Sequence, residues 1–132
     1  MGCIFVSFMN KALISIGSNE DRESNLARCQ ALLASYFSDI RYSSTSITSP
    51  YGSHYKNDFL NQLALVYTQQ EEVSVHNVLK KIEKEMGRSI SDKEKGIVII
   101  DIDLVIWNDK VLRPTDMERS YVRDLLSDLS SL

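Results

Sequence analysis

The strongest strand signal in the chain is the apolar run of residues 97–107, which is interrupted only by Asp101 and Asp103. Because side chains alternate between the two faces of a strand, these aspartates share one face, roughly 7 Å apart. The opposite face is expected to form an unbroken aliphatic surface for helices to cover, made by Val98, Ile100, Ile102, Leu104 and Ile106. The run therefore predicts a sheet with one apolar face and two carboxylates on the other.

Hydrophobic periodicity and turn residues define the remaining elements. Further strands are predicted at residues 12–16, 40–47 and 58–68. Amphipathic helices are predicted at residues 21–37, 75–86 and 121–129. Ser18, Asn19 and Asp21 are candidates to cap the first helix, and Gly87 is expected to end the second. The order β-α-β-β-α-β predicts an α+β, ferredoxin-like fold, with an antiparallel-rich sheet, helices on one face and a C-terminal helix.

The 132 residues are expected to form a single domain with a core of its own, because 43% are hydrophobic and 25% are charged. Residues 1–10 lack the pattern of a signal peptide and are expected to be an extra strand or a disordered extension. Cys3 and Cys29 have no metal-ligand spacing, so both are expected to be free thiols in a reducing cytoplasm.

Net charge and hydropathy limit the partners. A formal net charge of −3 gives little overall attraction for nucleic acid or for an anionic membrane surface, and no apolar run is long enough to span a bilayer. Neither nucleic acid nor membrane is therefore expected as a partner, and the chain is expected to be a monomer or a weak homodimer. A polyanionic small molecule would need an accompanying metal ion to bind here.

Two chemical interpretations of the aspartate pair remain open from spacing alone. Neighbouring carboxylates in an apolar strand repel each other and are costly to bury unless solvent or a cation compensates. Mg²⁺ suits such a pair, because it takes one or two carboxylates and completes its octahedron with water and phosphate oxygens. The alternative is two solvated aspartates on the open face of a one-sided sheet.

Four short motifs follow one another along the chain: Ile16-Gly17-Ser18-Asn19, Ser49-Pro50 with Phe59-Leu60-Asn61, Ile82-Glu83 with Gly87-Arg88, and Asp101-Ile102-Asp103-Leu104. In this order, and over the chain from Ala12 to about Leu129, they resemble the motifs of the 6-hydroxymethyl-7,8-dihydropterin pyrophosphokinase family. The resemblance implies transfer of pyrophosphate from ATP to the hydroxymethyl group of a reduced pterin, releasing AMP, in folate biosynthesis.

The resemblance also implies roles on the nucleotide side of such a site. Asp101 and Asp103 match the family's aspartates that hold two Mg²⁺ ions, and Arg88 matches an arginine that contacts phosphate. Glu83, Arg88 and Arg119 are the implied nucleotide-binding residues. The competing interpretations, from the residues alone, are an exposed loop arginine for Arg88 and a solvated residue on a helix surface for Glu83.

On the pterin side, the resemblance implies Ser49, Phe59, Asn61 and Tyr121. Phe59 and Asn61 lie two residues apart on a strand and so share a face, as a common pocket requires. Ordinary sheet packing for Phe59 and a core position in the last helix for Tyr121 are the competing interpretations. His54 and His76 have no partner at ligand spacing and are expected at the surface.

The chain departs from the family in the loop before the aspartates and after their strand. Val98 stands where the family has an arginine, and only Lys93 and Lys95 remain as cations of residues 89–98. A histidine of the family is absent near Pro114, and the family chain usually continues beyond position 132. A compact, divergent member is expected. A catalytically impaired nucleotide- or pterin-binding homologue, or an unrelated ferredoxin-like regulatory or interaction module, are the alternatives.

Overall fold

A computed structural model describes residues 9–50 and 52–130 of the chain. Its elements follow the predicted order, with three short additions, α3, β5 and α4. The elements are β1 (Asn10–Ser18), α1 (Arg22–Tyr36), β2 (Asp39–Thr48), β3 (Phe59–Thr68), α2 (Glu72–Glu85), α3 (Ile90–Glu94), β4 (Asp101–Trp107), β5 (Lys110–Val111), α4 (Pro114–Met117) and α5 (Ser120–Ser130). The expectation for residues 1–10 falls, up to residue 8, outside the described residues, as does that for Cys3.

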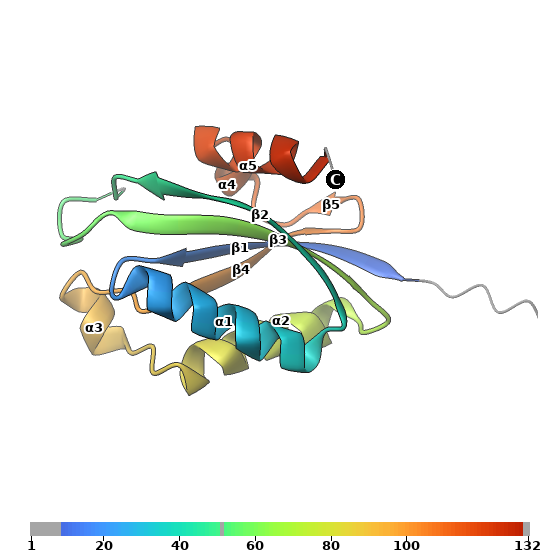
Figure 1. Ribbon diagram of the computed structural model, residues 1–132, viewed down its shortest axis with the longest axis horizontal. Coiled ribbons are helices and arrows are strands. Elements are labelled where there is room, and N and C mark those ends of the chain that lie inside the picture. Colours follow the sequence, from blue (N-terminus) through green and yellow to red (C-terminus); the bar gives the residue numbers. More distant parts are fainter. Residues whose placement is uncertain (1–8, 51, 131–132) are drawn as a thin grey trace, which may run out of the picture.

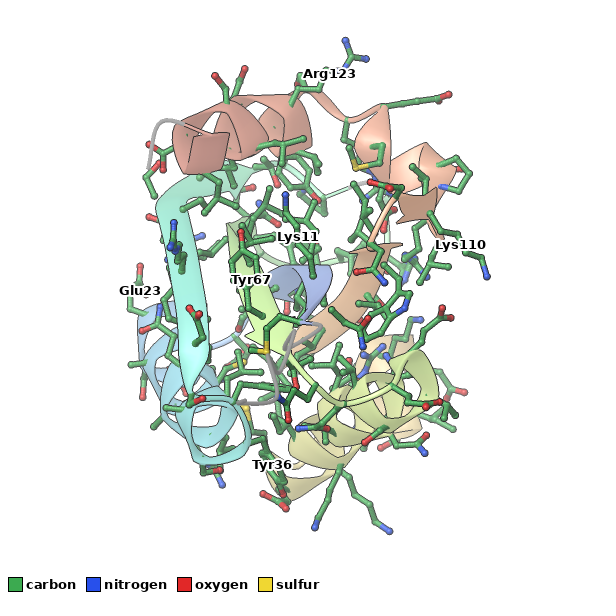
Figure 2. The ribbon with its side chains drawn as sticks, turned by 90° about the vertical axis from the view of Figure 1, so that its right-hand side faces the viewer. Lys11, Glu23, Tyr36, Tyr67, Lys110 and Arg123 are labelled. Atoms are coloured by element: carbon green, nitrogen blue, oxygen red, sulfur yellow. The ribbon has the colours of Figure 1, made fainter. Side chains whose placement is uncertain are left out.

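The strands form one sheet in the order β2-β3-β1-β4-β5, with every neighbouring pair antiparallel. Helices α1 and α2 lie on one face of the sheet, and α4 and α5 lie on the other (Figure 1). Seen from the side, the sheet lies between α5 and the α1–α2 layer, with side chains filling both interlayer spaces (Figure 2). This arrangement confirms the predicted α+β, ferredoxin-like fold with an additional C-terminal helix.

Strand β1 is central, and its register decides what lies beside the aspartates. Gly17 is opposite Asn61 of β3 on one side and opposite Asp101 of β4 on the other. Two residues earlier, Ser15 is opposite Asp103. Because alternate residues face the same side, these five residues share the sheet face toward α5.

A β-bulge in β4 corrects the expectation of an unbroken aliphatic face from Val98 to Ile106. Leu13 of β1 is opposite Ile106, whereas Ile14 is opposite Leu104, so Val105 is the extra residue. Leu104 packs in the core under α1 and α2, and Ile106 packs with the cluster under α5. One inserted residue moves every later side chain to the other face, which strand alternation alone does not predict.

Strand β4 begins at Asp101, four residues later than predicted, because the side chain of Asn19 replaces the strand pairing before it. The Asn19 Nδ2 donates to the Gly96 carbonyl at 2.9 Å, and its Oδ1 accepts from the Val98 N–H at 2.6 Å. Asn19 is 2% exposed and does not cap α1. Asp21 is the N-cap of α1, in a left-handed conformation and without a side-chain capping bond.

Two apolar clusters hold the layers together. The larger lies between the sheet and helices α1 and α2, and the smaller, built from Leu13, Leu63, Val122, Leu125 and Leu129, lies under α5. Cys29 is buried in the larger cluster as a free thiol, as predicted, and burial together with the Glu83 carboxylate raises its pKa to about 12.

Gly87, at φ +90°, follows α2 as predicted. Within the described ranges, no helix has both the length and the apolarity needed to cross a membrane.

We predict that Asn19→Ala destabilises the protein by roughly 2–4 kcal/mol. The buried Val98 N–H loses its side-chain acceptor, and the Gly96 carbonyl keeps only the longer bond from the Lys56 N–H, at 3.4 Å. Urea unfolding measures the change. Asn77→Ala, at an exposed position of α2, is the matched control and should shift the free energy of unfolding little. Equal effects of the two substitutions would contradict the role given to Asn19.

Candidate functional site

A hollow of about 190 Å³ lies on the sheet face that carries α4 and α5. Strands, the segment before β3 and the C-terminal helices all contribute to it. Its lining residues are Ser15, Gly17, Thr48, Tyr55, Phe59, Asn61, Asp101, Asp103, Arg113, Asp116, Arg119 and Tyr121. The structure therefore brings together Phe59, Asn61, Asp101, Asp103, Arg119 and Tyr121, all of which were predicted as site residues.

Gly17 forms the floor of this hollow between Asn61 and Asp101. A Cβ at this position would lie 3.4 Å from the Asn61 Oδ1 and 3.7 Å from the Phe59 ring. Glycine thus leaves these two side chains open toward the hollow. The Asn61 Nδ2 donates to the Thr48 Oγ1 at 2.8 Å and to the Ser46 carbonyl at 3.1 Å, which fixes the amide with its oxygen toward Gly17.

The two aspartates differ in burial and in partners. The Asp101 side chain is 40% exposed and accepts a hydrogen bond from Arg88 Nη1 at 2.8 Å. Asp103 is 16% exposed, and its Oδ1 lies 3.6 Å from Lys80 Nζ and 3.9 Å from Arg113 Nη1. The alternative of two solvated aspartates is therefore wrong for Asp103.

Burial and mutual repulsion separate the proton affinities of the pair. Burial, followed by the Asp101 carboxylate, raises the pKa of Asp103 to about 6. Burial also opposes ionisation of Asp101, but a hydrogen bond from the Asp103 carboxyl and the Arg88 guanidinium outweigh it and hold the pKa of Asp101 below its usual value. Without a bound cation, ionisation of both carboxyl groups at once is thus unfavourable.

Glu83 lies behind the aspartates, in contact with the backbone of β4. Strand β5 pairs with β4 at Ile106 and Trp107, so at Ile102 the outer edge of β4 meets α2 instead. The Ile102 N–H donates to Glu83 Oε2 at 2.7 Å, and Lys80 Nζ donates to the Ile102 carbonyl at 3.1 Å. Glu83 is 6% exposed, so its interpretation as a solvated helix residue is wrong.

Arg88 connects Glu83 to the aspartate pair. Its Nη1 donates to Glu83 Oε2 at 2.7 Å as well as to Asp101. Arg88 lines a neighbouring groove of about 300 Å³ together with Glu83, Lys80, Lys84 and Lys93. The structure thus places Glu83 and Arg88 beside the carboxylates but on the α2 side of β4, away from the first hollow.

The aromatic wall includes a residue that the sequence did not single out. The Tyr55 ring meets the Phe59 ring edge-on, with centroids 5.4 Å apart. Tyr55 itself stacks against His54, which is exposed, as is His76, as predicted. Tyr121 lines the hollow and also packs on the apolar cluster under α5. Ser49 is exposed just after β2, and its neighbour Thr48 lines the hollow instead.

Arg113 and Asp116, also unpredicted, form the wall nearest α4. Arg113 Nε donates to Asp116 Oδ2 at 2.5 Å, and Asp116 is buried. Only tertiary structure could identify them, because an arginine and an aspartate three residues apart in a polar segment have no distinctive pattern.

A second hollow, of about 530 Å³, adjoins the first along the edge of β4. It is lined by Glu71, Glu72, Val73, His76, Lys80, Asp103, Leu104, Leu112 and Arg113. Asp103 and Arg113 line both hollows, so one carboxylate and one cation lie at their shared wall. The second hollow combines an apolar side, at Leu104 and Leu112, with this charged end.

The aspartate pair fits a hard divalent cation that keeps open coordination positions. Within residues 9–50 and 52–130, no cluster of three or more His, Cys, Asp or Glu side chains is placed to hold a metal ion. Two carboxylates with room for ligand oxygens match the preference of Mg²⁺, which completes its octahedron with water and phosphate. Asp101 and Asp103 would hold such an ion.

Fold and pocket together define an α+β protein with an aspartate pair at a two-part cleft. The model of the 7,8-dihydro-6-hydroxymethylpterin-pyrophosphokinase (HPPK) family matches residues 13–131, and the chain belongs to this family. The resemblance predicted from the motifs is therefore confirmed, and the alternative of an unrelated ferredoxin-like module is wrong.

Two individual proteins are also similar. A folate synthesis bifunctional protein of Arabidopsis thaliana is 32% identical over 129 residues, which cover 90% of this chain and 27% of the plant protein. The chain thus spans about a quarter of the length of this curated relative. The C-terminal domain of the MgtC protein from Mycobacterium tuberculosis matches with a TM-score of 0.40 and 9% identity, over 73% of this chain and 87% of that domain.

We predict that Asp103→Asn stabilises the metal-free protein at pH 7 by roughly 2–3 kcal/mol, because it removes a carboxylate whose pKa is raised by folding. The native state binds this proton more tightly than the unfolded state, so its contribution to stability is complete below about pH 4. That contribution is lost as the pH rises through the native pKa of about 6.

The measurement is the free energy of unfolding of both proteins from pH 4 to pH 7. The advantage of the variant should grow over this range. Asp109→Asn, in the exposed turn after β4, is the control and should show no such growth. A variant advantage that is independent of pH would contradict the raised pKa of Asp103.

Proposed function

We propose that the chain transfers pyrophosphate from ATP to the hydroxymethyl group of 6-hydroxymethyl-7,8-dihydropterin, releasing AMP. The observation that supports this most is the position of Asp103, at the wall shared by two hollows, in a chain of the pyrophosphokinase family. A carboxylate there is within reach of a ligand in either hollow. A transfer reaction needs such an arrangement, because its two substrates must meet at one point.

The first hollow suits the pterin. Tyr55, Phe59 and Tyr121 offer aromatic surfaces for a flat bicyclic ring, and aromatic pairs of this kind favour offset or edge-on contacts. The Asn61 amide oxygen, held toward the hollow by the bonds of its Nδ2, would accept a hydrogen bond from the polar edge of the ring. The hydroxymethyl group would then point toward the aspartates.

The second hollow suits the nucleotide. Leu104 and Leu112 offer apolar contact for a base, and the triphosphate would lie at the end where Asp103, Lys80 and Arg113 meet. Mg²⁺ bound by Asp101 and Asp103 would neutralise phosphate charge there. Arg88 and Arg119, the cations that the resemblance assigns to the nucleotide, both lie outside this hollow. Arg119 lines the first hollow, and Arg88 lines the neighbouring groove, where Glu83 orients it. The chain's own contribution is to align the pterin hydroxyl with the β-phosphorus.

A homologue that binds these ligands without turnover is the second candidate. It is supported by Val98, whose side chain is buried in the interior at the position where the resembling family has an arginine. Its backbone is held on both sides by Asn19, so the segment presents no cation there. Loss of one preorganised cation at a transferring phosphate costs about 10²–10³ in rate.

We predict that the protein releases AMP from ATP only when both Mg²⁺ and the hydroxymethyl dihydropterin are present, and that Asp101→Asn and Asp103→Asn each lower the rate by roughly 100-fold or more. Both variants should also lose Mg²⁺-dependent binding of a non-hydrolysable ATP analogue. Asp109→Asn is the matched control and should retain both properties.

The outcomes separate the two candidates. Normal Mg²⁺-dependent binding of the analogue with no AMP above background would favour the non-catalytic homologue. Analogue binding that persists unchanged in both aspartate variants would contradict the metal site itself.

A further inference from the structure

Two cations from distant parts of the chain flank the same oxygen of Asp103. Lys80 Nζ, from α2, lies 3.6 Å from Asp103 Oδ1, and Arg113 Nη1, from the segment before α4, lies 3.9 Å from it. Both residues line the second hollow, and Arg113 lines the first as well. Arg113 therefore lies at the wall where the hollows meet, and Lys80 lies in the second hollow beside Asp103.

Other partners hold both cations in place independently of Asp103. Lys80 Nζ donates to the Ile102 carbonyl at 3.1 Å and lies 3.3 Å from both oxygens of Glu83. Arg113 Nε donates to Asp116 Oδ2 at 2.5 Å. The contacts to Asp103 are longer than these, and the two side chains are 40% and 48% exposed. Both cations are thus anchored while remaining accessible from the cleft.

Arg88 differs from these two cations. Its Nη1 is shared between the buried Glu83 and Asp101, at 2.7 and 2.8 Å. Two short bonds to carboxylates satisfy this nitrogen without any ligand. Lys80 and Arg113 are thus better placed than Arg88 to exchange a protein carboxylate for a ligand oxygen.

The net charge of the ligand bound at Asp103 decides whether these two cations oppose or favour its binding. A divalent ion that binds Asp103 alone brings positive charge within a few ångströms of Lys80 and Arg113, so both cations oppose its binding. Phosphate oxygens on the same ion reverse the local charge and provide anionic partners for both. Like charges near a site disfavour an ion, and opposite charges favour it.

We propose that Lys80 and Arg113 are phosphate-binding residues that make metal binding at the aspartate pair depend on the nucleotide. This rests on the proposed function and extends it to two residues. In the ligand-free protein their ammonium and guanidinium groups partly neutralise Asp103. When a metal–triphosphate complex binds, they exchange this carboxylate for phosphate oxygens.

The test compares Lys80→Gln, Arg113→Gln and the control Lys110→Gln in two titrations. Lys110 lies in β5, exposed at the outer edge of the sheet, and its substitution makes the same change of net charge (Figure 2). Mn²⁺ alone is titrated first, and electron paramagnetic resonance measures the concentration of free Mn²⁺ at each step. A non-hydrolysable ATP analogue is then titrated by calorimetry at saturating Mg²⁺.

Lys80→Gln and Arg113→Gln should bind Mn²⁺ alone roughly threefold to tenfold more tightly than the unmodified chain. The same variants should bind the analogue roughly tenfold or more weakly, because a charge-assisted bond to phosphate is lost. Lys110→Gln should change neither affinity. Lys80→Arg keeps the charge and should regain most of the analogue affinity that Lys80→Gln loses. A purely structural role of Lys80 at the β4 edge does not require this recovery.

Parallel loss of both affinities, or analogue affinities equal to that of Lys110→Gln, would overturn this inference and leave the proposed function standing. Thermal unfolding of each variant shows whether a parallel loss follows from unfolding, and Arg113→Gln, which leaves the β4 edge intact, provides the second independent reading. Absence of metal-dependent analogue binding by the unmodified chain would instead contradict the proposed function, and this inference with it.

Discussion

The buried carboxylate of Glu83 joins the helix layer to the strand that holds the two aspartates. Its Oε2 accepts from the Ile102 N–H and from Arg88, each at 2.7 Å, while Lys80 donates to the Ile102 carbonyl. These bonds satisfy a stretch of strand edge whose polar groups would otherwise face α2 unpaired. They also fix Arg88 against Asp101 and Lys80 near Asp103. The geometry of the whole cleft therefore depends on one side chain that is outside the first hollow.

Around Glu83, four carboxylates and three cations form one network with an excess of one carboxylate. Glu83, Asp101, Asp103 and Asp116 face Lys80, Arg88 and Arg113 across distances of 2.5 to 3.9 Å. Such a network is stable only while every member has a partner, because an unpaired charge is costly away from water. The raised pKa of Asp103 shows that the balance is incomplete without a ligand. A bound divalent cation with its phosphates would complete the charge balance. Binding would therefore relieve the unfavourable interactions of the ligand-free site.

Much of the fold could be predicted from sequence, because hydrophobic period and turn residues are local signals. The pairing of Asp101 and Asp103 on one face followed from strand alternation alone, and the fold then placed Phe59 and Asn61 in the same hollow. The bulge at Val105 could not be predicted, because it depends on register against β1. The bonds of Asn19, the burial of Glu83 and the positions of Lys80 and Arg113 likewise depend on contacts between residues distant in the chain.

Mapping the metal by paramagnetic broadening of backbone amide signals tests the central claim most directly. With Mn²⁺ and a non-hydrolysable ATP analogue together, the strongest broadening should fall on Gly17, Asn61 and residues 101–103. It should weaken toward Lys11 and Tyr67, which lie six residues along β1 and β3 from Gly17 and Asn61, or roughly 20 Å at the rise of a strand. Broadening centred on another part of the chain, or equally strong at both ends of β1, would contradict a metal–nucleotide site at the aspartate pair.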